Sequence, residues 1–210
     1  CSPSYPPSSS PPSSPSFPPP RMRQQDNTRK RNRVENITDD NIHQLVRLYV
    51  DNRDSVPTYL QGISISKWDV SRVTNMAGLF ADLTDFNESL NEWDVSNVTR
   101  MVYMFNGCKS FNQPLDKWNV TQVTNMETMF QECESFNQPL NKWNVTQVTD
   151  MNGMFWVCKS FNQPLDKWNV TQVTDMNCMF RDCPNFNQPL NNWDVSNVTR
   201  MHGMFSRCER

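Results

Sequence analysis

The 210-residue chain carries 20 Lys and Arg against 22 Asp and Glu, and a net charge of -2 does not suggest a nucleic-acid-binding protein, which would be basic. Its 7 Trp and 12 Phe, most of them at a fixed spacing, argue against disorder over the main body. No apolar run approaches the ~20 residues of a membrane-spanning helix and no signal-peptide pattern begins the chain, so we expect a mature product or an excerpt.

Residues 1–35 predict an extended arm followed by a basic linker. Residues 1–20 contain only Cys, Ser, Pro, Tyr and Phe, a composition that favours polyproline II and cannot build a core. We interpret them as a spacer or stalk, with a ligand for aromatic-lined grooves as the alternative. Residues 21–35 hold six Lys and Arg against two acids, which is typical of a solvated linker; an arm that touches an anionic surface is the alternative.

Residues 36–60 predict an N-terminal cap that contains one helix, from about residue 39 to residue 52. The stretch from Thr38 to Asn41 is polar and places acids in the first turn. The apolar residues that follow at helical spacing are Ile42, Leu45, Val46, Leu48, Tyr49 and Val50. A repeat array needs an atypical terminal element over the open end of its core, so we expect this helix to act as a cap.

Residues 61–210 repeat a unit of 25 residues about six times. The unit reads Phe-Asn-Gln-Pro-Leu-(Asp/Asn)-x-Trp-(Asp/Asn)-Val-(Ser/Thr)-x-Val-Thr-x-Met-x-x-Met-Phe-x-x-Cys-x-x, and a degenerate first copy precedes five fuller ones. The tryptophans that mark the period are Trp68, Trp93, Trp118, Trp143, Trp168 and Trp193. Self-similarity at this spacing is typical of a solenoid, in which no coil buries its apolar face alone.

Two periodicities inside the unit predict one short strand and one short helical turn per 25-residue coil. Trp118 and Val120 alternate with polar neighbours, as in a half-buried strand. From Thr124 onward the apolar spacing changes to three and four, with Thr124 as a candidate N-cap. We therefore predict an α/β solenoid of the leucine-rich-repeat type. Its predicted core consists of Trp93, Val95, Val98, Met101, Met104, Phe105, Leu115 and their equivalents.

The repeat also resembles a known family. The pairing of Met-Phe-x-x-Cys-x-x-Phe with Trp-(Asp/Asn)-Val-(Ser/Thr)-x-Val-Thr-x-Met, over roughly residues 36–210, is similar to the BspA-type leucine-rich-repeat surface proteins. The resemblance implies a secreted or surface-displayed protein, extracellular or on a cell or virion surface, with a role in adhesion or matrix binding. Leu79 and Leu83 depart from the pattern in the first unit, and the Pro-rich lead is not part of it.

Two recurring columns have structural interpretations. Cysteines at a spacing of 25 predict a buried column, and disulfides between adjacent coils are the alternative. These cysteines are Cys108, Cys133, Cys158, Cys183 and Cys208, whereas Cys178 lies off the column and is the candidate for an exposed thiol. The asparagines that follow each Phe predict a ladder whose side chains satisfy backbone groups. They are Asn87, Asn112, Asn137, Asn162 and Asn187.

The sequence offers no constellation for catalysis, a cofactor or a metal. No motif places a nucleophile or a carboxylate beside His43 or His202, and the five Gly form no phosphate loop. We therefore expect a non-enzymatic protein.

Several Asn-x-Ser/Thr sequons occur, and one of them predicts a glycoprotein. Those at Asn119, Asn144 and Asn169 would place glycans ~5 Å apart on one face, where they would collide. Asn36, outside the coils, is the predicted glycosylation site.

Strand side chains that cannot face the core predict a partner-binding face. Because Trp118 and Val120 point inward, the residues beside them should point outward and form columns. The face consists of Lys117, Asn119, Thr121, Lys142, Asn144, Thr146, Lys167, Asn169 and Thr171. The lysine column holds no acid among its three lysines, and an anionic partner would relieve their repulsion. A solvated face that only keeps the protein soluble is the alternative.

For function we expect protein–protein interaction or adhesion, with a protein or extracellular-matrix partner and no membrane span within the chain. The alternative is a structural component of an extracellular or viral assembly, in which copies of the chain or other subunits cover the open last coil.

Overall fold

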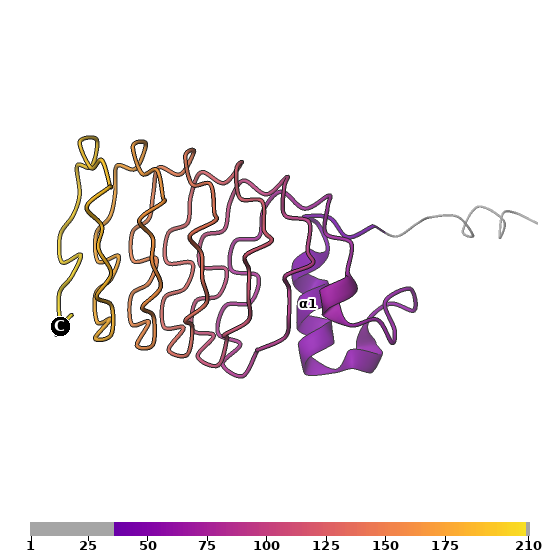
Figure 1. The fold of residues 1–210 in the computed structure, drawn as a ribbon. Coiled ribbons are helices and arrows are strands. Elements are labelled where there is room, and N and C mark those ends of the chain that lie inside the picture. The colour runs from indigo at the N-terminus through magenta and orange to yellow at the C-terminus, as the bar shows by residue number, and fades with distance from the viewer. Residues whose placement is uncertain (1–35, 209–210) are drawn as a thin grey trace, which may run out of the picture. The chain divides into compact units, whose positions relative to one another are not determined.

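A computed structural model of the protein describes residues 36–208, so the arm and linker predicted for residues 1–35 lie outside the described residues. Helix α1 (Ile42–Asp51) comes first, and a row of coils follows it side by side (Figure 1). Two short 3₁₀ turns, η1 (Arg53–Ser55) and η2 (Ile65–Lys67), complete the helices of this part of the chain. None of these helices has the length and apolarity to cross a bilayer.

Helix α1 starts later than the helix expected from residue 39. Its N-cap, Asn41, makes no side-chain capping bond within the helix, and its Oδ1 instead accepts from the N–H of Thr38 at 2.9 Å. The expected acids in the first turn are absent because Asp39 precedes the helix and binds the first coil. The helix buries Ile42, Leu45, Val46 and Tyr49.

Each coil pairs with the next in parallel, in a register of 25 residues. One residue per coil forms a parallel bridge, beginning with Asn75 and Arg100. Alternate N–H groups after the bridge donate to the following coil: Met76 to the carbonyl of Arg100 at 3.0 Å, and Gly78 to that of Val102 at 2.8 Å. The same bonds recur down the row, so the coils share one register.

The strand and helical turn expected in each coil do not form as regular elements, since residues 68–208 contain neither. The paired segment is a run of tight turns, in which the N–H of Leu79 also donates to Met76 of its own coil at 3.2 Å. Two positions per coil have left-handed backbone, as at Gly78 with φ 66° and Asp82 with φ 63°. A strand needs φ near -120°. Thr124 caps no helix.

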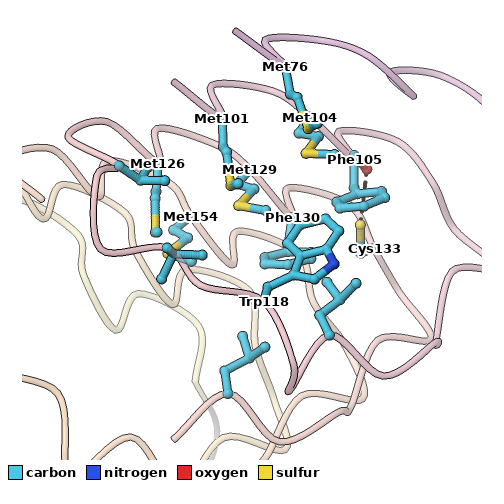
Figure 2. Packing of buried hydrophobic residues seen from close by; sticks show 14 of the residues in the cluster. Met76, Met101, Met104, Phe105, Trp118, Met126, Met129, Phe130, Cys133 and Met154 are labelled. Atoms are coloured by element: carbon cyan, nitrogen blue, oxygen red, sulfur yellow. Dashed lines mark hydrogen bonds between the residues drawn. The ribbon is translucent and has the colours of Figure 1, made fainter. Parts of the chain in front are cut away.

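The core is built from columns of like side chains that stack between coils (Figure 2). The rings of Trp118 and Trp143 lie 6.3 Å apart and 3° from parallel, and those of Phe105 and Phe130 lie 5.6 Å apart. Trp118 is 4% exposed and Trp143 is 3% exposed, which confirms that both point inward. The predicted core residues that are confirmed as buried are Trp93, Val95, Val98, Met101, Met104, Phe105 and Leu115.

From Trp93 onward, the indole and thiol groups of the core bond to the preceding coil, whereas the buried Nε1 of Trp68, in the first coil, has no partner within residues 36–208. The indole Nε1 of Trp118 donates to the carbonyl of Leu90 at 2.9 Å, and the thiol of Cys133 donates to that of Phe105 at 3.0 Å. Burial raises the pKa of the Cys108 thiol to about 12. Four cysteines of the predicted column are therefore confirmed as buried, namely Cys108, Cys133, Cys158 and Cys183, whereas Cys208 in the last described coil is half-buried. The cysteines among the described residues are free.

The asparagine ladder is also confirmed. Asn87 Oδ1 accepts from the N–H of Asn112 in the next coil at 2.9 Å and from the side chain of Gln113 at 3.1 Å. Asn112 repeats this with the N–H of Asn137 at 3.0 Å. Each rung satisfies a backbone donor that the tight turns leave without a carbonyl.

The N-terminal segment takes the place of a preceding coil for the first coil. Between ordinary coils, the N–H of Thr99 donates to the carbonyl of Thr74 at 2.8 Å. Thr74 has no such coil before it, and its N–H donates to the Asp39 carboxylate at 2.8 Å, with its hydroxyl on the other oxygen at 2.6 Å. A carboxylate thus substitutes for the missing carbonyl.

Two side chains of α1 perform the complementary task of supplying donors. His43 Nε2 lies 2.8 Å from the carbonyl oxygen of Ala77, and Arg47 donates to that of Ala81 at 2.9 Å. Because a carbonyl only accepts, Nε2 of His43 carries the proton. These two carbonyls are equivalent to those that receive N–H groups in later coils. The helix therefore closes the first coil chemically as well as sterically.

Candidate interaction face

The nine residues of the predicted face lie in stacked columns on the turn around the buried tryptophans. Their lysines and asparagines are exposed, whereas Thr121, Thr146 and Thr171 are half-buried. Asn119 Oδ1 accepts from the N–H of Thr121 at 3.2 Å and from its hydroxyl at 2.7 Å. The asparagines and threonines therefore bond to each other within a coil, and the lysines are the groups left for a partner.

The lysine column is not a row of unpaired charges, and that part of the prediction is wrong. Lys117 Nζ lies 2.5 Å from Glu92 Oε1, and Lys142 Nζ lies 3.1 Å from Asp116 Oδ2. The hydrogen bond with Glu92 raises the pKa of Lys117, and the same bond lowers the pKa of Glu92. These exposed pairs add little stability, but they remove the repulsion that would have favoured an anionic partner.

An alternating Asn/Asp column beside the lysines explains the ion pair of Lys142, whereas Lys117 pairs with Glu92 one coil back in its own column. Asn91 donates to Asp116 Oδ1 at 3.1 Å, and this bond, followed by the one from Lys142, lowers the pKa of Asp116. Lys167 instead follows Asn141, so it forms no ion pair within residues 36–208. The alternation is visible in the sequence, but only when two neighbouring columns are read together.

A second surface carries the residues that differ from coil to coil. It consists of the outward side chains of residues 102–107, 127–132, 152–157, 177–182 and 202–207, and we call it the variable side. The inward positions of these segments keep Met-Phe, with a core Met just before each segment and a Cys just after it, while the outward positions change in nearly every coil. Sequence reasoning missed this surface, although its signal is the set of positions at which the repeat fails.

Aromatic and cationic groups lie on the variable side. Tyr103 is 44% exposed. Trp156 is half-buried, donates its Nε1 to Asp182 Oδ2 at 3.2 Å, and has the Arg181 guanidinium 5.2 Å from its ring centroid. Tyr, Trp and Arg are the residue types enriched in the buried centres of protein interfaces.

Acids gather along one edge of the variable side. Burial, and then the charge of Asp175, raises the pKa of Asp150; burial, and then the charge of Asp150, raises the pKa of Glu127. Asp175 pairs with Arg200 at 3.4 Å. Among the described residues no group of three His, Cys, Asp or Glu is arranged to hold a metal ion. These acids therefore lie near one another, and Asp175 is buried and paired with Arg200.

The other residues singled out in the sequence lie outside both faces or make only local contacts. His43 serves the cap, and His202 is exposed in the last coil with its N–H donated to Asn177 Oδ1 at 2.8 Å. Cys178 is partly exposed, as expected for a thiol off the column. Asn36 is half-buried, and its glycosylation stays a prediction.

Comparison with known proteins gives a family match over the repeats. A family model described as "Mycoplasma protein of unknown function, DUF285" matches residues 51–159 and 139–210. No curated protein and no solved structure matches the chain.

Proposed function

The chain belongs to the DUF285 family of repeat proteins, and from this premise we propose that it is a non-enzymatic solenoid of the BspA-like leucine-rich-repeat kind that binds a protein partner. The stacked coils in one register support the solenoid, and the recurring Met-Phe-x-x-Cys pattern supports the family type. Secretion or surface display, with the Pro- and Ser-rich residues 1–20 as a stalk, follows from the resemblance to BspA-type proteins.

The variable side carries the proposal of partner binding. A surface that repeats every 25 residues offers a partner several equivalent registers, so it does not fix one bound position. The variable side breaks that equivalence, since Tyr103, Trp156 and Arg207 each occur in one coil only at their positions. Extended surfaces of repeat proteins are the places where they bind partners. This surface is therefore suited to bind a protein or matrix partner in one defined position along the array.

The experiment compares the two candidate faces on one folded protein. Binding of the labelled chain to arrayed extracellular-matrix proteins is measured for the double variant Tyr103→Ala, Glu132→Lys on the variable side. The same measurement is made for Lys117→Glu, Lys142→Glu, Lys167→Glu on the predicted face. We expect at least a tenfold loss for the first variant and little change for the second.

Other results would change the assignment. A loss confined to the lysine variant assigns binding to the predicted face. Equal binding by both variants and the parent chain, with unchanged melting temperatures, removes both faces from the proposal.

A structural role in an extracellular or viral assembly is the second candidate. Size-exclusion chromatography with light scattering separates the two, because an assembly subunit forms obligate oligomers and an adhesive protein is a soluble monomer.

A further inference from the structure

The first repeat unit differs from the later ones at the corner where each unit begins. The later units begin with Phe-Asn, whereas the first begins with Gln61 and Gly62. The side-chain amide of Gln61 donates to two backbone carbonyls of the preceding loop, each at 3.2 Å. Gly62 has no side-chain oxygen to offer to the coil that follows. The next corner, which starts at Phe86, is therefore not covered in the ordinary way.

Two backbone donors near that corner are left without their usual acceptors. In the following coil, the N–H of Asn112 donates to Asn87 Oδ1 at 2.9 Å, and the N–H of Ser110 donates to the carbonyl of Thr84 at 3.0 Å. The equivalent donors one coil earlier are the N–H groups of Asn87 and Asp85, and neither has an acceptor within residues 36–208. The first of them lacks one because a glycine stands where the ladder needs an asparagine.

A hollow of about 430 Å³ lies over these donors, between α1 and the corner. Both residues that carry the unmet donors line it, together with the apolar side chains of Val50, Leu83 and Phe86. Val50 is 40% exposed and Leu83 is half-buried, whereas Cys108, at the position equivalent to Leu83, is 0% exposed. The cap and the first coil thus lie on either side of the hollow without filling it.

The polar lining of the hollow is anionic. Asp82 and Asp85 line it and form no ion pair within the part of the chain that the structure describes. Arg53 is already engaged, since it donates to Glu88 Oε1 at 2.6 Å while the hydroxyl of Tyr49 donates to Oε2 at 2.9 Å. Charge complementarity therefore favours a cationic ligand, and an uncharged oxygen suits the two backbone donors better than a carboxylate does.

We propose that this hollow binds a segment of a partner protein in which a basic residue is followed by Phe-Asn. The Asn side-chain oxygen accepts from the N–H of Asn87, and a main-chain carbonyl accepts from the N–H of Asp85. The Phe lies against Val50 and Leu83, and the basic residue meets the carboxylates of Asp82 and Asp85. Main-chain bonds that hold a peptide while pockets select its side chains are a common mode of peptide recognition. This inference rests on the proposed role in protein–protein interaction and adds a site outside the variable side.

A second folded copy of the chain is a poor occupant. The Phe of every Phe-Asn pair in the described coils is buried. In one such pair Phe161 is 0% exposed, and Asn162 Oδ1 already accepts from the N–H of Asn187 at 2.9 Å. These pairs are therefore committed to their own coils, and the segment must come from a different polypeptide.

The test uses the full chain, isotope-labelled for NMR, and a synthetic peptide with blocked ends and the sequence of residues 159–165. This peptide carries Lys, Phe and Asn in the proposed order. In two-dimensional amide spectra we expect saturable shifts of the Asp85 and Asn87 signals. The peptide with Asn162→Ala lacks the side-chain oxygen and should bind about fivefold more weakly, as expected for one lost hydrogen bond.

Two variants of the chain add the same charge at different places on α1. Val50→Arg should weaken binding of the parent peptide by about tenfold, because the arginine fills the hollow and competes for its carboxylates. Gln44→Arg, at an exposed position outside the lining, should leave binding unchanged. Both variants change exposed side chains and should keep the parent melting temperature.

Three results would overturn the inference: no shift of the Asp85 and Asn87 signals, equal binding by Val50→Arg, or equal binding of the Asn162→Ala peptide. Hydrogen exchange at both amides in the free chain, if as slow as at Ser110 and Asn112, would show that the chain itself fills the hollow and would also overturn it. Matrix binding through the variable side is measured separately, so failure of the peptide leaves the proposed function standing.

Discussion

Replacing Trp143 by Ala removes one rung from the middle of the core. The side chain is 3% exposed, stacks on Trp118 at 6.3 Å, and donates to the carbonyl of Leu115 at 2.9 Å. A buried Trp-to-Ala change costs about 3 to 5 kcal/mol of unfolding free energy, and the lost aromatic pair places this site in the upper half of that range. Trp143→Phe keeps most of the apolar burial and should cost about 1 to 2 kcal/mol, mainly through the lost hydrogen bond and the smaller ring.

The matched control lies in the last described coil. Trp193 is 9% exposed and has no further coil over its ring within the described residues, so Trp193→Ala should cost about half as much as Trp143→Ala. Urea unfolding followed by far-UV circular dichroism gives the three free energies. Equal losses for Trp143→Ala and Trp193→Ala would refute the reasoning, because they would mean that stacking between coils contributes nothing.

Three further predictions concern backbone strain, charge and thiols. Val157 has φ 61°, so Val157→Gly should raise the unfolding free energy by roughly 0.5 to 1 kcal/mol in urea titrations, whereas Gly107→Ala, at the equivalent position, should lower it. Burial and then the charge of Asp175 raise the pKa of Asp150, so its charge opposes folding at neutral pH. Asp150→Asn should therefore raise the unfolding free energy by about 0.5 kcal/mol at pH 7. This gain should vanish below the ordinary Asp pKa of 3.8, where the carboxyl is neutral in both the folded and the unfolded state. Brief alkylation followed by peptide mapping should label Cys178 and spare Cys133 until the protein unfolds.

The sequence was sufficient for the contents of the core. A period of 25 places Trp118 over Trp143 in any stacked arrangement, and alternation with polar neighbours assigns Trp118 and Val120 to the inside. The asparagine ladder followed from the same logic, since a polar residue present in every coil must serve the coil itself. These inferences need only the 25-residue period, which the spacing of the recurring residues shows directly.

The local backbone could not be predicted in the same way. The turns of each coil depend on left-handed φ at two positions, and Tyr103 and Thr128 occupy one of them without any sign in their chemistry. Apolar residues spaced three and four apart fit a helix and a chain of tight turns equally well. The predicted short helical turn was therefore wrong for these coils, which form tight turns instead. The contacts that decide between them are hydrogen bonds to the neighbouring coil.

The candidate face was harder still, because its electrostatics depend on ion pairs between neighbouring coils, both within a column and between columns. Lys142 looked unpaired beside Lys117 and Lys167, yet its partner Asp116 lies one coil back in the adjacent column. The cap chemistry was likewise out of reach: His43 and Arg47 bind backbone carbonyls, which no side-chain pattern records.

Because the cap binds backbone carbonyls and not particular side chains, the number of repeats in the gene can change without disturbing the cap. His43 and Arg47 contact main-chain oxygens that every coil possesses, and neighbouring coils join through the same main-chain bonds at each junction. A gene that gains or loses 25 codons by unequal recombination would therefore still encode a capped array with intact junctions. Lengthening or shortening such a protein therefore needs no compensating change in its N-terminal cap. A single recombination event would be enough to make its partner-binding surface longer or shorter.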